Sequence, residues 1–434
     1  MNGTIVNAAG ITMAAIAQIA TVPILTHTWG VDRYGAWLML TTMPAYLALS
    51  DLGFASAATS DMTMQVARGM HSQVRATFQS AWVLVNTVSI AIILATLALA
   101  FVLPLVGTLP TWAQEHQISL VVLILYSAVV MNARIVLAGL RATQNYALGT
   151  MLYQVMTLLE VTATLTVAWS GGSFAACASA MLCVQILNFL LMLATLQKRV
   201  PWLRLGIGQA ALPEIRRLWI PALAAMAIPS ALAINLQGMV LVTGVFISAT
   251  AAATFASVRT VSRVAIQMVG AINRATMPEL SAAGATGQRA ALAKMVALNL
   301  ATVGFVLIPG AVLFGTIGDR LVSIWTGGRI QPNALFVLLV ALATVAHGLW
   351  YYTSNLMLAS NEHTAVSGLL VSVSIGSVLL AIPVAHFVGL FGMGLVLLLT
   401  ETACLIGVLK VAVQSKLIDP KDVKSAFTPQ FWRS

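Results

Sequence analysis

The chain has 434 residues, of which 59% are hydrophobic and only 8% charged, and its mean hydropathy is +0.94. Such a small number of charged side chains cannot cover the surface of a water-soluble domain, and the composition therefore excludes a water-soluble protein. The formal net charge is +10. A basic chain of this kind could bind nucleic acid, but the distribution of its charges, described below, points to membrane topology instead.

Apolar runs follow one another along the whole chain, and each is long enough to cross the hydrocarbon of a bilayer as a helix. They lack the strand alternation of an outer-membrane barrel. The first run has no basic stretch before it and is longer than a signal peptide, so we interpret it as a retained helix. The predicted spans are 4–29, 34–66, 76–103, 118–140, 146–169, 174–196, 218–247, 250–277, 294–318, 333–357, 365–388 and 390–413.

Lysine and arginine are distributed unevenly between the two ends of these spans. Seventeen of the 22 lie on one side, three (Arg33, Arg320 and Arg329) lie on the other, and Arg259 and Arg263 lie within a span. Because basic residues mark the cytoplasmic side, this asymmetry places both termini in the cytoplasm of a bacterial inner-membrane protein.

The longest basic connection, 197–219, divides the spans into two sets of six. There, Trp202 and Leu203 beside Arg204 predict a short interfacial helix. We expect a six-helix bundle at 1–200, a cytoplasmic interfacial linker at 201–217, a second bundle at 218–414 and a cytoplasmic tail at 415–434. The predicted fold is all-α. Because the two halves have similar patterns of helices and loops, we expect the two bundles to be related by pseudo-two-fold symmetry around a central cavity.

The eighth predicted span carries charges at bilayer depth, where each costs at least about 2.5–3.5 kcal/mol on insertion scales. At about 100° per residue, its polar residues Arg259, Arg263, Gln267 and Arg274 share one face. No acidic residue lies nearby on this helix. The stripe could form a cationic track for a phosphate, a pyrophosphate or an acidic sugar. Alternatively, the arginines pair with carboxylates on other helices, and Arg274 marks the cytoplasmic end.

Three carboxylates within spans are candidates for ion coupling. Asp51, in the motif SDLGF, could couple an ion or serve as the counter-ion of Arg259 or Arg263. Glu160 belongs to a polar stripe with Tyr153, Thr157 and Thr164, which could carry protons or hold helices together. Glu401 lies in the middle of the last span. Asp61, nearer the cytoplasm, is interpreted as structural.

Two prolines, Pro221 and Pro229, predict a kinked seventh span with freed carbonyl groups, which would suit gating. Arg134 and Arg141 are seven residues apart and share a face near the cytoplasmic end of the fourth span. They could extend to lipid head groups or receive an anionic head group from the cytoplasm. His347 is interpreted as an interfacial or core residue.

The sequence offers no candidates for catalytic chemistry. Its three cysteines fall in apolar segments, which predicts neither a disulfide nor a metal site. It shows no nucleophile-and-base pair, no metal-spaced cluster and no glycine-rich phosphate loop. We therefore expect a protein that is not an enzyme and has no cofactor.

Five local patterns, in order, are similar to those of the Wzx-type polysaccharide flippases of the multidrug/oligosaccharidyl-lipid/polysaccharide exporter (MOP) superfamily. They are VPILTHTWGVDRYGAWLML (22–40), LSDLGFASA (49–57), MPELSAAGATGQRAAL (277–292), SIWTGG (323–328) and LMLASNEHTAVS (356–367). The resemblance covers essentially the full length in topology. The first span lacks the arginines that the related lipid II flippases carry there, which argues against a peptidoglycan precursor.

The resemblance implies that the protein moves an undecaprenyl-pyrophosphate-linked oligosaccharide, a repeat unit of O-antigen, capsule or exopolysaccharide, from the cytoplasmic to the periplasmic leaflet. It implies coupling to an H⁺ or Na⁺ gradient and a cationic cavity with Arg259 and Arg263 on one wall. The candidate partners are membrane lipid, a polysaccharide polymerase and a chain-length regulator. Nucleic acid is not a candidate partner.

Two alternatives remain at this point. A multidrug or cation antiporter of the same superfamily would favour a cavity dominated by carboxylates, whereas the eighth span is cationic. A membrane enzyme acting on polyprenyl-linked sugars would need a sizeable periplasmic segment, and the predicted outer connections are short.

Overall fold

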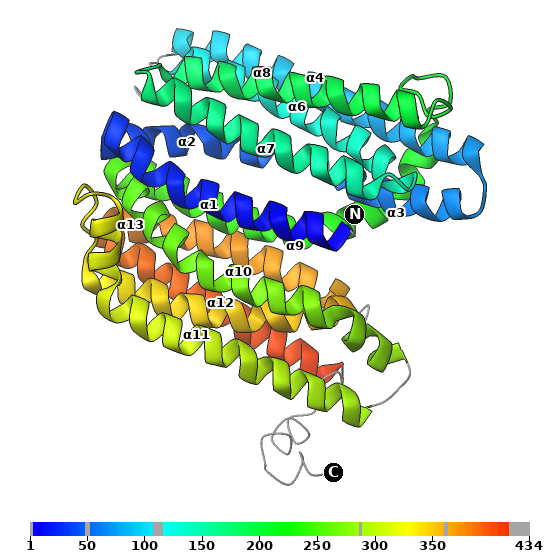
Figure 1. The fold of residues 1–434 in the computed structure, drawn as a ribbon. Coiled ribbons are helices and arrows are strands. Elements are labelled where there is room, and N and C mark those ends of the chain that lie inside the picture. Colours follow the sequence, from blue (N-terminus) through cyan, green and yellow to red (C-terminus); the bar gives the residue numbers. More distant parts are fainter. Residues whose placement is uncertain (1–2, 48–52, 107–115, 286–288, 360–362, 416–434) are drawn as a thin grey trace. The chain divides into compact units, whose positions relative to one another are not determined.

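The computed structural model describes residues 3–47, 53–106, 116–285, 289–359 and 363–415, and the regular structure of these residues is helical (Figure 1). Its helices are α1 (Gly3–Trp29), α2 (Val31–Leu47), α3 (Phe54–Ala67), α4 (His71–Val106), α6 (Gln117–Ala142), α7 (Tyr146–Trp169), α8 (Phe174–Arg199), α9 (Leu212–Phe246), α10 (Ala249–Ala285), α11 (Arg289–Trp325), α12 (Ala334–Ala359) and α13 (His363–Gln414).

Eight stretches of the described helices are long and apolar enough to cross a membrane. The longest, Val366–Gln414, covers two predicted spans, because α13 joins two helices across a kink at Gly389, where φ is 69°. The eighth predicted span forms α10, a continuous helix of 37 residues, but it is not among the eight stretches. Its many alanine, threonine and serine residues and its arginines lower its hydropathy.

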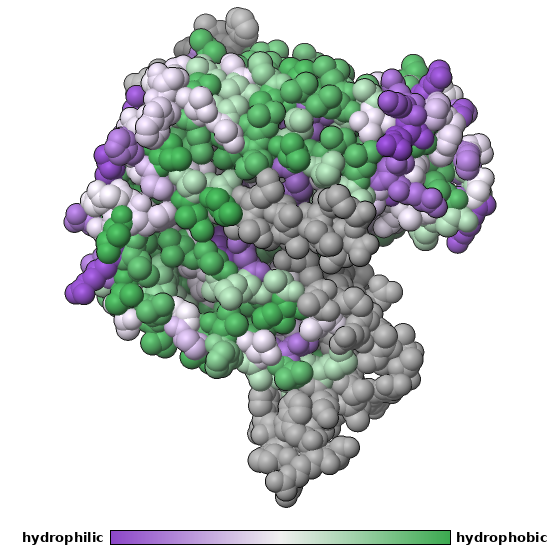
Figure 2. Space-filling model, in the orientation of Figure 1, coloured by the Kyte–Doolittle hydropathy of each residue, from purple (hydrophilic) through white to green (hydrophobic). Residues whose placement is uncertain are grey.

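Large apolar side chains cover the outside of the helices. Phe305 and Phe387 are each 81% exposed, and Ile90, Leu94 and Ile406 are more than half exposed. Figure 2 shows apolar residues over much of the visible face and hydrophilic residues gathered at its edges. In water such a surface would be unstable, whereas lipid tails solvate it. The helices therefore belong to a multi-pass membrane protein.

The chain divides into two compact units, Met1–Ala233 (unit 1) and Ile234–Ser434 (unit 2), and α9 passes from the first into the second. In unit 1 a core of α3, α4, α6 and α8 surrounds the fully buried Phe78 and Met131. In unit 2 a smaller core joins α10, α11 and α12 around Leu307 and Tyr352.

The second predicted span is not one continuous helix. Residues 31–47 form α2 and residues 54–67 form α3, and Asp51 lies outside the described residues. Gly53, the residue before α3, has φ of +72°, a conformation that favours glycine. A Cβ there would also collide with the backbone oxygen of Ala222 on α9. The sequence therefore breaks the helix where the chain turns tightly against α9.

The short interfacial helix predicted at Trp202–Arg204 is not formed. Residues 200–211 are turns and irregular backbone, and α9 begins at Leu212. Leu203 is fully buried in the core of unit 1, and Trp202 stacks on His71 at 4.4 Å between ring centroids. Nearby glycines and a proline disfavour a helix, and burial of Leu203 together with the stacking of Trp202 holds the segment instead.

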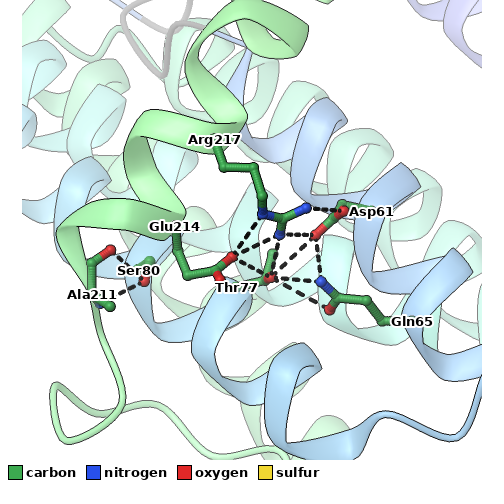
Figure 3. A network of polar contacts seen from close by, with 7 residues as sticks. All are labelled: Asp61, Gln65, Thr77, Ser80, Ala211, Glu214 and Arg217. Carbon is green, nitrogen blue, oxygen red and sulfur yellow. Dashed lines mark hydrogen bonds and ion pairs between the residues drawn. The ribbon is translucent and has the colours of Figure 1, made fainter.

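A polar network fixes the start of α9 to α3 and α4 within unit 1 (Figure 3). Arg217 donates two hydrogen bonds to Asp61, from Nη1 at 2.7 Å and from Nη2 at 2.6 Å, and a third from Nη2 to Glu214 at 2.7 Å. Asp61 also accepts hydrogen bonds from Gln65 and Thr77. Hydrogen bonding to Asp61 is the main cause that raises the pKa of Arg217. These contacts agree with the structural interpretation of Asp61.

Candidate functional site

A buried polar cluster lies among the apolar helices of unit 2. Its members are Asn235 on α9, Arg259 on α10, His347 and Trp350 on α12, and Glu401 on α13. Arg259 is 9% exposed and Glu401 is 4% exposed. Charged groups are rarely buried unless they have partners, so each must be accounted for.

Helical spacing presents Arg259 to this cluster. Phe255 and Arg259 are four residues apart on α10 and so share a face. The guanidinium lies over the Phe255 ring at 5.5 Å from its centroid, and Nη2 donates a hydrogen bond to Oδ1 of Asn235 at 3.1 Å. The other terminal nitrogen, Nη1, is buried and has no hydrogen-bond partner among the described residues. Arg259 is therefore held in place, while one of its hydrogen-bond donors has no partner among the described residues.

Glu401 faces two partners from one turn of α12. His347 and Trp350 are three residues apart and thus lie on the same side of that helix. Trp350 Nε1 donates a hydrogen bond to Oε2 of Glu401 at 2.7 Å, and His347 Nδ1 lies 3.0 Å from the same oxygen. Glu401 also interacts electrostatically with Arg259. The interaction is electrostatic only, since the ion pairs of the described residues do not include one between Arg259 and Glu401, so the pairing that the sequence left open for Arg259 is not a direct contact.

The other predicted members of the arginine stripe are placed differently. Arg263 is half-buried, one turn beyond Arg259, and repels it electrostatically. Gln267 is also half-buried, and Arg274 lies within α10, but its side chain is outside the described residues. A cavity of about 170 Å³ in unit 2 is lined by the Ser262 side of α10, not by these residues.

Such a cluster can do two things chemically. A guanidinium with an unoccupied N–H group can bind an anionic oxygen, and two neighbouring arginines strengthen that preference. A carboxylate beside a histidine can take up and release a proton. The cluster combines both groups on four helices of one unit.

The remaining predicted carboxylates do not join this cluster in the described part of the chain. Glu160 on α7 accepts a hydrogen bond from the Tyr126 hydroxyl of α6 at 2.7 Å. The threonines of its predicted stripe, Thr157 and Thr164, donate to backbone carbonyl groups of their own helix. The stripe thus ties α6 to α7 through Glu160. Asp51 lies outside the described residues.

Both predicted gating prolines are exposed residues of α9, which remains helical through them. Pro221 lies in the turn after Arg217, and Pro229 lines a cavity of unit 1. Each removes one backbone hydrogen bond of the helix. Their role in gating stays a prediction.

Trp350 and Phe255 are site residues that sequence reasoning missed. Phe255 is a single aromatic residue in a run of small residues, and Trp350 is the first of three consecutive aromatic residues, so neither position gives a signal for a polar site. His347 and Asn235 were visible as polar residues in spans, but His347 was interpreted as a core or interfacial residue. Spacing on α12 would have placed His347 and Trp350 together, yet it could not identify Glu401 as their partner.

No protein-family model matches the sequence, and neither does any curated protein sequence. Solved structures do match. An inward-facing multidrug resistance MATE family transporter of the MOP superfamily has a TM-score of 0.75 and 13% identity, with 95% of this chain and 100% of that chain covered. The lipid II flippase MurJ, in an inward closed conformation, has a TM-score of 0.72 and 15% identity, with 98% of this chain and 89% of that chain covered. A mutant of a MATE transporter from Vibrio cholerae has a TM-score of 0.62 and 14% identity, with 95% of each chain covered.

These likenesses extend over nearly the whole chain, and at such low identity they concern the fold. Both the transporters and the flippase share it, so it does not by itself select a substrate. The chain has the all-helical fold that the multidrug resistance transporter and the lipid II flippase share.

Proposed function

We propose that this protein is a flippase for an undecaprenyl-pyrophosphate-linked oligosaccharide, which it moves from the cytoplasmic to the periplasmic leaflet of the bacterial inner membrane. The glycan would be a repeat unit of O-antigen, capsule or exopolysaccharide. The fold supports a carrier of this general kind, because one of the solved structures that share it is a lipid II flippase.

The observation that carries the proposal is the state of Arg259. A guanidinium buried in an apolar helix bundle is costly, and here one of its terminal nitrogens has no hydrogen-bond partner among the described residues. Arg263 adds a second positive charge one turn away, while Glu401 supplies a single negative one. This excess of positive charge favours an anionic ligand such as pyrophosphate. Gln267 and Arg274 on the same helix are proposed to extend the track.

The carboxylate of Glu401 is the part of the site suited to ion coupling. Its contact with His347 places a carboxylate and an imidazole 3.0 Å apart, and the two groups together could hold a coupling ion. Protonation would alter the electrostatic balance with Arg259, and this could link ion binding to release of the anion. Asp51 and Glu160 are further candidates for coupling, and Pro221 and Pro229 for the bending of α9.

The test is export of the glycan in cells that lack the native gene and produce a variant. Arg259→Ala combined with Arg263→Ala should abolish surface glycan and cause the lipid-linked intermediate to accumulate on the cytoplasmic side. The measurements are surface glycan and lipid-linked intermediate, compared at equal amounts of membrane-inserted protein.

Arg320→Ala is the matched control, because Arg320 is an exposed arginine at the far end of α11 and belongs to no part of the cluster. It should leave export unchanged. Normal surface glycan in the double variant, at equal protein levels, would show that the two arginines do not hold the substrate.

A multidrug or cation antiporter is the second candidate, because most of the solved structures reported above are MATE transporters and the cluster holds a buried carboxylate. In that case Glu401→Gln should abolish drug efflux, whereas loss of Arg259 and Arg263 should not. Efflux of cationic dyes from cells that produce each variant separates the two functions.

A further inference from the structure

Unit 1 contains a cationic region of its own. A cavity of about 260 Å³ opens between α3, α6, α7 and the first part of α9. Its described lining includes two arginines, Arg134 and Arg141, together with the hydroxyl-bearing residues Ser56, Thr59 and Tyr153. The described residues that line it include no carboxylate.

Both arginines come from one face of α6. They are seven residues apart, which is two helical turns and about 10 Å along the axis, so their long side chains can converge on one small ligand. Tyr153 on α7 contributes its side chain to the same cavity. The arrangement joins two forked cationic donors to polar groups of two other helices.

Arg141 is held in a fixed orientation without having all its donors occupied. Its guanidinium lies over the Tyr146 ring at 5.2 Å from the centroid. Its Nε is buried and has no hydrogen-bond partner among the described residues. An arginine that merely extends to lipid head groups would expose this donor to water. Here the donor is withdrawn from water, which is costly unless a ligand accepts its hydrogen bond.

The second arginine interacts with a tyrosine whose hydroxyl group contacts a carboxylate. Arg134 interacts electrostatically with Tyr126, and the Tyr126 hydroxyl is hydrogen-bonded to Glu160. Glu160 is not among the described residues that line the cavity. The described lining of the cavity thus contains two arginines and no carboxylate.

The size of the cavity limits what it can hold. Sites for drug-sized ligands have volumes of about 300–1,000 Å³, so a cavity of this volume suits a small polar group and not a whole oligosaccharide. Guanidinium groups recognise phosphate oxygens through paired hydrogen bonds. Because both arginines belong to the basic, predicted cytoplasmic side, a ligand from that side would meet them first.

We propose that this cavity binds a phosphate or pyrophosphate group and that Arg134 and Arg141 hold it. The inference rests on the proposed function for the lipid to which that group belongs: the cavity would receive the pyrophosphate of the lipid-linked substrate on the cytoplasmic side. It concerns unit 1 alone and does not depend on Arg259.

The test measures binding to the purified full-length protein in nanodiscs of neutral phosphatidylcholine. The probes are undecaprenyl pyrophosphate, inorganic pyrophosphate and the uncharged undecaprenol. Arg134→Gln and Arg141→Gln should each weaken binding of undecaprenyl pyrophosphate about tenfold or more, because each removes charge-assisted hydrogen bonds. Arg199→Gln is the matched control, since Arg199 is an exposed arginine at the end of α8, and it should bind as the native protein does.

The probes distinguish the source of the group. Competition by inorganic pyrophosphate would show that the phosphate group alone is recognised, whereas binding of the lipid without such competition would assign the site to a lipid head group. Equal affinity in the native protein and both glutamine variants would overturn the proposal, and so would equally tight binding of undecaprenol. Arg134→Lys and Arg141→Lys keep the charge and should bind with intermediate affinity, which guards against variants that fail to fold.

Failure of this inference differs from failure of the flippase proposal. If glycan export depends on Arg259 and Arg263 but binding is insensitive to Arg134 and Arg141, only the unit 1 site is wrong. If binding depends on Arg134 and Arg141 but the cells export glycan without Arg259 and Arg263, the unit 1 site stands and the proposed transport site falls.

Discussion

At the scale of single residues, the buried cluster of unit 2 is a balance of opposite charges that are held by different helices. Arg259 has Asn235 and Phe255 as neighbours, and Glu401 has Trp350 and His347. Buried ion pairs often add little net stability, because the cost of removing both groups from water offsets their attraction. Their presence in the core therefore suggests a role beyond stability.

Removal of one partner has a different cost from removal of both. Arg259→Ala leaves Glu401 buried without its cationic neighbour, so we expect the free energy of unfolding to fall by about 1–3 kcal/mol. Glu401→Gln in the same chain should restore part of this loss, since the uncompensated charge is gone. Thermal unfolding of the two single variants and the double variant in detergent measures the coupling. Strictly additive effects would show that the two charges do not interact.

The residues of this cluster could be predicted individually, but their contacts could not. Arg259 and Glu401 were recognisable because charged residues in an apolar span are unusual. Their proximity joins residues that are far apart in the sequence, and helical periodicity carries no information on such contacts. Asp51, an equally good counter-ion by sequence, lies outside the described residues, so that alternative stays open.

At the scale of elements, α9 is fixed at its start by Arg217, which lies one turn before Pro221. Its bidentate contact with Asp61 crosses from α9 to α3, and Thr77 adds α4. The side chain of Arg217 is 46% exposed and that of Asp61 is 14% exposed, so the pair is only partly screened by solvent. The network therefore anchors the helix that carries both prolines.

Asp61→Asn should weaken this anchor. The variant loses the charge that holds Arg217, and we expect a loss of about 1 kcal/mol in the free energy of unfolding, since the guanidinium can turn to solvent. Glu214→Gln is the matched control: it leaves the bidentate pair intact, so its effect should be smaller. The comparison uses thermal unfolding of both variants in detergent. An equal loss in the two variants would mean that the bidentate geometry contributes nothing.

The predicted elements show which signals of the sequence are dependable. The apolar run at 146–169 forms α7 with the same bounds, because a long apolar segment in lipid has to satisfy its backbone groups as a helix. The run at 34–66 failed as one helix, because the turn at Gly53 depends on close contact with Ala222 of another helix. The linker at Trp202–Arg204 failed because burial of Leu203 overrode the amphipathic pattern.

At the scale of the whole molecule, the distribution of lysine and arginine is the property that fixes orientation in the membrane. Seventeen of the 22 basic residues fall on one predicted side. Short loops with this bias stay in the cytoplasm. The loop before α9 contains Gly208, and the turn between α7 and α8 contains Ser170, both exposed and on opposite predicted sides. These two positions therefore report the topology directly.

Single cysteines at these positions test the orientation in intact cells. We start from a chain in which Cys177, Cys183 and Cys404, which form no disulfide, are replaced by alanine. Ser170→Cys should react with a membrane-impermeant maleimide in intact cells, because its turn lies on the predicted periplasmic side. Gly208→Cys should react only after the inner membrane is permeabilised, and a Cβ at Gly208 meets no other atom within 4 Å, so the substitution fits. The reverse pattern would place both termini in the periplasm. It would also turn the arginine cavity of unit 1 away from the side where a lipid-linked substrate is made, so this labelling pattern decides whether that cavity can receive a head group from the cytoplasm.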